Sequence, residues 1–244
     1  MRITEHLYQL CGSCYGTNSS IYALDAGDEL IVFDAGFSSK QLEVMERVRK
    51  RWHLEDKPIT HVFLTHAHLD HVGNARQFQE AGAKLLIGKE EAPVLEKGGL
   101  VVLEKLFGLT FERCKPDCAV QEGDSWTFGE AEIEAVALPG HTAGSMGYLI
   151  RVDGIKAMVT GDFFSLGLTT PDESEQEIML AAMIKPSYSE EDYGKSLLKV
   201  ADMDVNILLP GHLITYEGDV RTILLAAYHK LRTEPHEVMD LTKS

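Results

Sequence analysis

Short apolar runs separated by turn residues dominate the first third of the chain. Such runs lie at residues 3–10, 20–24 and 30–33, and the last of them leads into Asp34-Ala35-Gly36. Runs of this length between turn signals are typical of strands, and their close succession predicts that they pair in hairpin order.

Helical spacing replaces this pattern after residue 37. Ser38 or Ser39 is a suitable N-cap for a helix that ends at Arg51, and its apolar face is formed by Leu42, Met45, Val48 and Trp52. The compact apolar run at 61–64 predicts a buried strand. Residues 72–81 are then predicted to form a helix closed by Gly82, and 84–87 the next strand.

Residues 88–118 interrupt this rhythm of strands and helices. We interpret them as a helical insertion with an apolar patch that consists of Leu100, Val101, Val102, Leu103, Leu106, Phe107, Leu109 and Phe111. The patch faces a substrate, forms the contact of a homodimer, or packs on the protein's own core. The pattern does not distinguish these three places.

The second half of the chain returns to strands, at 126–128, 133–137, 147–152, 156–160 and 207–209. A loop is expected around Thr169, Thr170 and Pro171. Ser189 followed by acidic residues predicts a helix to about residue 201, and 220–231 forms an amphipathic helix. Strands followed by helices in two halves predict an α/β fold with two packed sheets and outer helices.

Length and charge narrow the class of protein. A chain of 244 residues with 44% hydrophobic content suits one α/β domain, and no linker divides it, so we expect a single domain over 1–244. Its net charge of -15 predicts a surface that repels nucleic acid and acidic membranes. Because no apolar leader or membrane-spanning run is present, we expect a cytoplasmic protein that acts on a small molecule.

Four cysteines are too few for a disulfide scaffold: Cys11, Cys14, Cys114 and Cys118. Their CxxC and CxxxC spacings are compatible with a structural metal or a redox pair. Since no thioredoxin-like context surrounds Cys11, ordinary loop or core cysteines are the favoured interpretation.

Histidines and aspartates gather in a pattern that suits metal ions. His66 and His68 are two residues apart, so at a strand end they project to the same side. Asp70 and His71 follow where the chain turns into a helix. The other candidates, His141, Asp162 and His212, each follow an apolar strand and a glycine, where a missing side chain lets the backbone bend into a shared cleft.

The pattern His-x-His-x-Asp-His followed by separate His, Asp and His resembles that of the metallo-β-lactamase superfamily, in its glyoxalase and lactonase branch, and all seven positions match. The resemblance implies a four-layer αββα sandwich of two mixed β-sheets flanked by helices. It assigns His66, His68 and His141 to one metal, Asp70, His71 and His212 to the other, and Asp162 to both. Asp34 resembles a position that supports the site from behind the ligands.

Imidazole and carboxylate ligands suit two divalent ions, zinc first, with iron or manganese as alternatives. The resemblance implies hydrolysis by a metal-bridged hydroxide, with no serine or cysteine nucleophile. Asp70 is the candidate catalytic residue, because its second oxygen can accept a proton from the attacking water.

Residues outside the ligand set bear on the substrate. Homoserine lactonases commonly have a tyrosine three residues after the bridging aspartate, where this chain has Ser165. Candidate substrate contacts are Phe163, Phe164, Tyr188 and Tyr193. A small ester, thioester or lactone is therefore the expected substrate.

Three alternatives stay open. A persulfide dioxygenase of this fold uses a single iron at positions equivalent to His66, His141 and Asp162. A phosphodiesterase or a β-lactam hydrolase has the same ligands, although the charge argues against RNA as a substrate. A noncatalytic metal-binding protein would be expected to lack a ligand, and none of the seven is missing.

Overall fold

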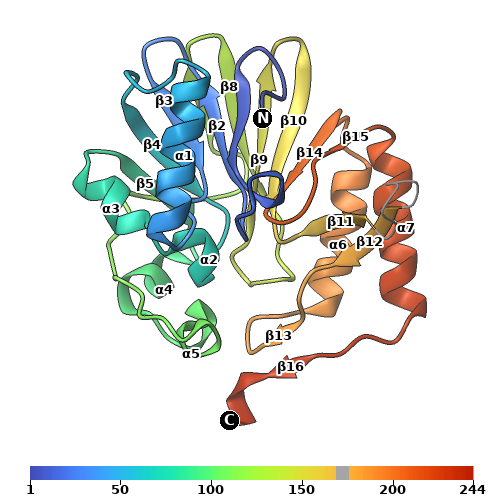
Figure 1. Ribbon diagram of the computed structural model, residues 1–244. Coiled ribbons are helices and arrows are strands. Elements are labelled where there is room, and N and C mark those ends of the chain that lie inside the picture. Colours follow the sequence, from blue (N-terminus) through green and yellow to red (C-terminus); the bar gives the residue numbers. More distant parts are fainter. Residues whose placement is uncertain (169–175, 244) are drawn as a thin grey trace.

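Two six-stranded β-sheets stacked face to face form the centre of the molecule (Figure 1). The computed structural model describes residues 1–168 and 176–243. The first sheet has the order β1-β2-β3-β4-β5-β6 and the second β15-β14-β10-β9-β8-β7. The strands of the first sheet are β1 (Leu7–Cys11), β2 (Ile21–Asp25), β3 (Leu30–Phe33), β4 (Ile59–Leu64), β5 (Lys84–Gly88) and β6 (Cys118–Val120).

The second sheet collects the strands of the second half of the chain. They are β7 (Ser125–Phe128), β8 (Ala131–Ala137), β9 (Met146–Val152), β10 (Ile155–Gly161), β14 (Ile207–Pro210) and β15 (Tyr216–Glu217). Both sheets are mixed: β3 to β6 run parallel, as do β10 and β14, while β1 to β3 and β7 to β10 pair in antiparallel order.

Helices cover the outer face of each sheet. The first sheet carries α1 (Ser39–Arg51), α2 (Leu69–Val72), α3 (Ala75–Glu80) and α4 (Ala92–Lys97), and the second carries α6 (Glu190–Ala201) and α7 (Val220–Thr233). This confirms the predicted αββα sandwich. The expected caps are also present, since Ser38 and Ser189 each accept a hydrogen bond from a backbone N–H of the first turn. Among the described residues, no helix has the length and apolar character needed to cross a membrane.

Three apolar layers hold the sandwich together. Alternate residues of β3 divide between two of them: Leu30 and Val32 pack under the helices, whereas Ile31 and Phe33 lie between the sheets. The third layer lies between the second sheet and helices α6 and α7. Because successive side chains point to opposite faces, an unbroken apolar strand is what a sheet covered on both sides requires.

The helix predicted over 72–81 is two helices, α2 and α3, and it begins earlier, within the histidine motif. The break falls at Gly73 and Asn74. A Cβ on Gly73 would lie 2.5 Å from the Cβ of Phe37, and the Asn74 side chain donates to the carbonyl of Ala35. These contacts with the 35–38 loop bend the chain where local periodicity predicts a continuous helix.

The 88–118 segment contains α4, a short 3₁₀ helix, η2 (Leu100–Val102), and α5 (Glu104–Phe107). Its apolar patch divides between the protein's own core and the surface. Val102, Leu103 and Phe111 are buried, whereas Leu106 is 52% and Leu109 45% exposed. Phe107 packs against Phe37 with ring centroids 5.5 Å apart, which attaches α5 to the loop after β3.

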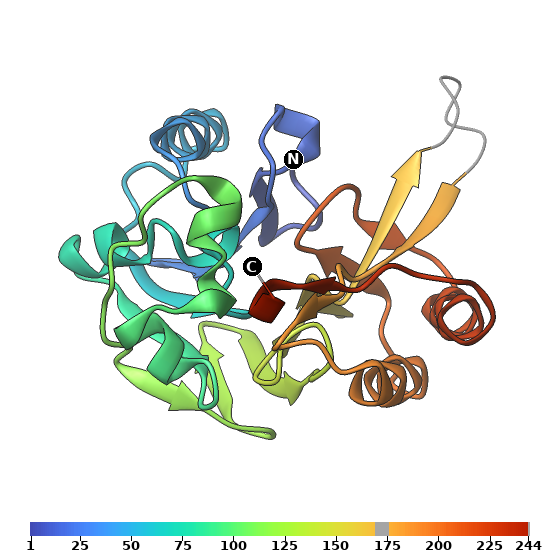
Figure 2. The same cartoon turned by 90° about the horizontal axis from the view of Figure 1, so that it is seen from below.

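Several small elements were not predicted. A hairpin of β11 (Phe164–Leu168) and β12 (Gln176–Leu180) follows β10, and the loop expected at Thr169, Thr170 and Pro171 lies outside the described residues. β13 (Ile184–Lys185) pairs with β16 (Met239–Asp240), which leads into a 3₁₀ helix, η3 (Leu241–Lys243). Seen from below in Figure 2, this C-terminal segment runs from α7 toward the middle of the molecule.

All four cysteines are free thiols. Cys11 and Cys114 are buried, and burial raises the pKa of the Cys11 thiol to about 12. Cys11 donates to the backbone carbonyl of Gln41, so it has a packing role in the core. This agrees with the interpretation as ordinary core and loop residues.

Candidate metal centre

The seven predicted ligands lie together at one edge of the two sheets. Strand β4 ends just before His66, and the parallel strands β10 and β14 end just before Asp162 and His212. His141 lies in the turn between β8 and β9. Since parallel strands present their carboxyl ends at the same edge, residues far apart in the sequence meet here.

The start of α2 supplies three further side chains. His68 precedes the first helical residue, and Asp70 and His71 lie in the first turn. The side-chain hydroxyl of Ser19 donates to the backbone carbonyl of Asp70, and the backbone N–H of Ala35 donates to the backbone carbonyl of His71. The short helix is thus held against the loops of the first sheet.

One group of ligand atoms consists of His66, His68, His141 and Asp162, all within 4.8 Å of one another. The Nε2 of His141 lies 2.9 Å from the Nδ1 of His68. The Oδ2 of Asp162 lies 3.4 Å from the Nε2 of His141 and 3.9 Å from that of His66.

A second group consists of Asp70, His71 and His212, also within 4.8 Å of one another. The Nε2 of His212 lies 3.2 Å from the Oδ2 of Asp70. The Oδ1 of Asp162 lies 3.0 Å from the Nε2 of His71 and 3.2 Å from that of His212.

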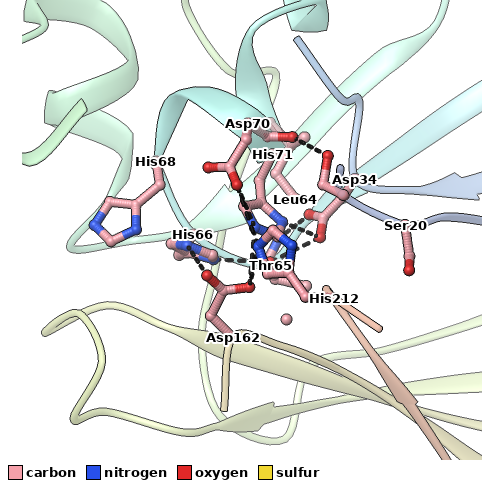
Figure 3. A network of polar contacts seen from close by, with 12 residues as sticks. Ser20, Asp34, Leu64, Thr65, His66, His68, Asp70, His71, Asp162 and His212 are labelled. Carbon is pink, nitrogen blue, oxygen red and sulfur yellow. Dashed lines mark hydrogen bonds and ion pairs between the residues drawn. The ribbon is translucent and has the colours of Figure 1, made fainter. Parts of the chain in front are cut away.

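Asp162 therefore stands between the two groups, with one oxygen facing each. Figure 3 shows its carboxylate at the end of a strand of the second sheet, below the histidines. A carboxylate in this orientation is suited to bridge two cations.

Contacts behind four of the histidines orient their rings. The Nδ1 of His66 faces the hydroxyl of Thr65, and the Nδ1 of His71 faces the carboxylate of Asp34. The Nδ1 of His141 faces the backbone carbonyl of Ala182, and that of His212 faces the backbone carbonyl of Asn18. Each ring thereby presents its Nε2 to the cluster. Such contacts are typical of metal-ligating histidines, because they set the tautomer and the angle of the ring. Two of these four partners are backbone carbonyls. Every residue has one, so the sequence did not indicate these two partners.

Asp34 takes the supporting position that the sequence predicted. It is 2% exposed, and its Oδ2 lies 2.8 Å from the Nδ1 of His71. Its carboxylate also accepts from the backbone N–H and the hydroxyl of Thr65, the residue before His66. One carboxylate thus orients His71 and the loop that carries His66.

Electrostatics differ between the two groups. Burial and the neighbouring histidines lower the pKa of His66 and His68, and burial lowers that of His141, so these rings are neutral and can donate lone pairs. Burial also acts to lower the pKa of His212, but the Asp162 carboxylate outweighs it and raises the value to about 10. The carboxylates of Asp162 and Asp70 beside His212 thus attract cations, whether protons or a metal ion.

The lack of hydrogen-bond partners at several buried ligand atoms also fits a metal ion. The Nε2 of His66 is buried and has no hydrogen-bond partner within the described part of the chain. The buried Nε2 of His71 and Oδ1 of Asp162, although 3.0 Å apart, do not form a hydrogen bond either. Leaving a buried polar atom unpaired costs about 1–3 kcal/mol. Several such atoms converging on one place are explained by ligation of cations.

Access to the cluster is from one side. Five of the ligands are at most 5% exposed, whereas the side chains of Asp162 and His212 are 12% and 24% exposed. A substrate would therefore approach over Asp162 and His212.

Two of the glycines that precede ligands act in different ways. Gly140 has a φ of 142°, a backbone conformation that other residues rarely adopt. Gly211 is needed for space, because a Cβ there would lie 2.6 Å from both the Oδ1 of Asp162 and the Cε1 of His71.

The substitution Gly211→Ala is expected to displace these two side chains and to weaken metal binding by about 10- to 100-fold, the range typical of perturbed metal surroundings. Titration of the chelated protein with zinc in the presence of a competing chelator measures this effect. Unchanged affinities in a folded Gly211→Ala protein would contradict this account of the glycine.

The predicted substrate contacts do not lie on the open side. Phe163, Phe164 and Tyr193 are at most 2% exposed in the core layer under α6 and α7, and the Tyr193 hydroxyl donates to the carbonyl of Phe163. These three side chains present almost no surface in this structure, so their contact with a substrate stays a prediction.

Tyr188 differs from these residues in one respect. It is 9% exposed and packs beside Tyr193, but its buried hydroxyl has no hydrogen-bond partner among the described residues. Burial raises the pKa of this hydroxyl to about 12, so it stays protonated and able to donate.

Comparison with known proteins agrees with this geometry. A family model described as the metallo-beta-lactamase superfamily matches residues 14–212. Among solved structures, a subclass B3 metallo-beta-lactamase of Bradyrhizobium japonicum superposes with a TM-score of 0.74 over 96% of this chain and 92% of that one, at 21% identity. At this identity the likeness shows the fold alone.

Curated proteins similar in sequence include a hydrolase and a protein of unassigned activity. A hydroxyacylglutathione hydrolase of Brucella anthropi is 34% identical over 121 residues, which cover 49% of this chain and 37% of that enzyme's length. The uncharacterized protein YobT of Bacillus subtilis is 25% identical over 232 residues, 87% of this chain and 91% of that protein.

Proposed function

Because this chain belongs to the metallo-β-lactamase superfamily, we propose that it is a dinuclear metal-dependent hydrolase of a small ester, thioester or lactone. The observation that carries the proposal is Asp162, whose two oxygens face two separate groups of ligand atoms. His66, His68 and His141 would hold one ion, Asp70, His71 and His212 the other, and Asp162 both. Neutral imidazoles with carboxylates favour zinc.

When bound, such ions lower the pKa of a coordinated water to about 7 and polarise a carbonyl oxygen. The protein's own contribution lies in orientation and proton transfer. The Oδ2 of Asp70 faces His212 and His71, and its Oδ1 has no hydrogen bond to any described residue. That oxygen is available to accept the proton of the attacking water and to pass it to the leaving group.

The preference for ester-type bonds has two supports. The curated hydrolase that is 34% identical over 121 residues acts, by its name, on hydroxyacylglutathione, an acyl conjugate of a thiol. A net charge of -15 disfavours a polyanionic substrate such as RNA.

Elemental analysis of the purified protein, together with assays on lactones, thioesters, aryl esters, phosphodiesters and β-lactams, tests the proposal. Two zinc ions per chain with hydrolysis of an ester-type bond is the expected result. A single iron with oxygen consumption on a persulfide would replace the proposal with a dioxygenase. Hydrolysis confined to β-lactams or phosphodiesters would overturn the substrate class.

We also propose that the exposed side of α5 forms a homodimer contact. Leu106 and Leu109 are large apolar side chains at the surface, which favours association. The substitution Leu106→Glu is expected to shift the elution of the protein in size-exclusion chromatography from dimer to monomer. Leu106 is preferable to Phe107 for this test, because Phe107 packs against Phe37. A wild-type protein that elutes as a monomer would contradict the dimer.

A further inference from the structure

Glu91 is a buried acidic residue that no ligand pattern includes. It follows β5 directly, in the turn that leads into α4, and it is 3% exposed, whereas its neighbour Glu90 is exposed. From the sequence the pair looks like an ordinary solvated turn. Only the folded structure shows that one of the two side chains is buried and the other exposed.

The carboxylate of Glu91 joins two loops that carry metal ligands. Its Oε2 accepts from the backbone N–H of Ala67 at 3.0 Å, and its Oε1 accepts from the backbone N–H of Gly144 at 3.0 Å. Ala67 stands between His66 and His68, and Gly144 is in the loop that follows His141. The three histidines that these loops carry belong to the same group of ligand atoms.

The packing around this contact leaves little room for the loops to move. A Cβ on Gly144 would lie 2.7 Å from the Cγ of Glu91, and a Cβ on Gly88 would lie 2.4 Å from the carbonyl oxygen of Gly144. A backbone hydrogen bond from Met146 to Thr65, the residue before His66, also joins the same two parts of the chain. The distance between the loops is therefore determined by short contacts, with Glu91 as the one charged group among them.

Charge supports the same role. Glu91 forms no ion pair with a basic side chain of the described residues, although an isolated buried carboxylate is costly. Burial raises its pKa, and hydrogen bonds from Thr142, Ala67 and Gly144 oppose that rise.

We propose that Glu91 is a positioning residue for the metal ion of the His66, His68 and His141 group, as Asp34 is for the group that contains His71. This inference rests on the proposed function, because it concerns the same centre. Glu91 sets the spacing of the two loops, and through it the spacing of the three imidazoles. Removing it weakens one of the two metal sites selectively.

The test is Glu91→Gln, with Glu90→Gln as a matched control that makes the same charge change one residue away on the surface. In the variant, one oxygen acceptor becomes an NH₂ group that opposes a backbone N–H. Zinc affinities are measured by chelator competition, and the absorption spectrum of the cobalt-loaded protein reports ligand geometry without turnover. The thermal midpoint shows whether each variant is folded.

We expect Glu91→Gln to weaken one site by about 10- to 100-fold and to leave the other unchanged, with Glu90→Gln equal to the wild type. In a His212→Ala background, where the three-histidine group remains complete, the same loss should appear. If Glu91→Gln does not fold, Glu91→Asp, which retains the charge but is too short to reach both loops, should show the same selective loss.

Equal zinc affinities in wild type and the Glu91 variants would overturn the role of Glu91 and leave the proposed function intact. An equal loss at both sites together with a lower thermal midpoint would also overturn it, since a purely structural clamp gives that result. A wild-type protein that takes up no metal would overturn the proposed function itself and this inference with it.

Discussion

Replacing Asp162 by asparagine is expected to remove at least one metal ion and to lower kcat/KM by about 10³-fold. Its two oxygens face the Nε2 atoms of His141 and His66 on one side and those of His71 and His212 on the other. Asparagine presents an NH₂ group to one of these sets and carries no charge, so two cations would repel each other across it. Elemental analysis and kinetics on the same preparation measure both effects.

A suitable control is Asp204→Asn, which changes charge equally on an exposed aspartate paired with Lys156. That variant should keep full metal content and activity. An Asp162→Asn protein with two tightly bound ions and unchanged kcat/KM would show that the carboxylate does not bridge the groups.

Replacing Asp70 by asparagine is expected to lower kcat by about 10²- to 10⁴-fold, the range typical of lost general acid–base catalysis. Asparagine has nearly the shape of aspartate but cannot hold the proton that the free Oδ1 of Asp70 is placed to accept. The variant should retain at least the ion of the three-histidine group, because Asp70 belongs to the other group.

Metal content must be matched before the rates are compared, since Asp70 also faces His212 at 3.2 Å. The Asp70→Asn protein is therefore loaded with zinc to the stoichiometry of the wild type, and kcat is measured across pH. Turnover close to the wild-type value in the fully loaded variant would remove Asp70 from the proton transfer.

The sequence by itself determined the main strands and helices and named the seven candidate ligands. Strands and helices were predicted from the apolar spacing, and the caps at Ser38 and Ser189 follow from local side-chain chemistry. The seven ligands could be named because each lies beside a strand end or in a dense motif, and the structure brings all of them together. These signals are local, so the chain reveals them without its fold.

Tertiary structure decided the properties that depend on contacts between distant residues. Glu90 and Glu91 are adjacent and identical in type, yet only Glu91 is buried between the two ligand loops. Phe163 and Tyr193 were expected beside a substrate and lie in the core, because α6 and α7 cover that side of the second sheet. Burial and the partner of a buried charge result from packing across the whole fold, and no window of neighbouring residues contains them.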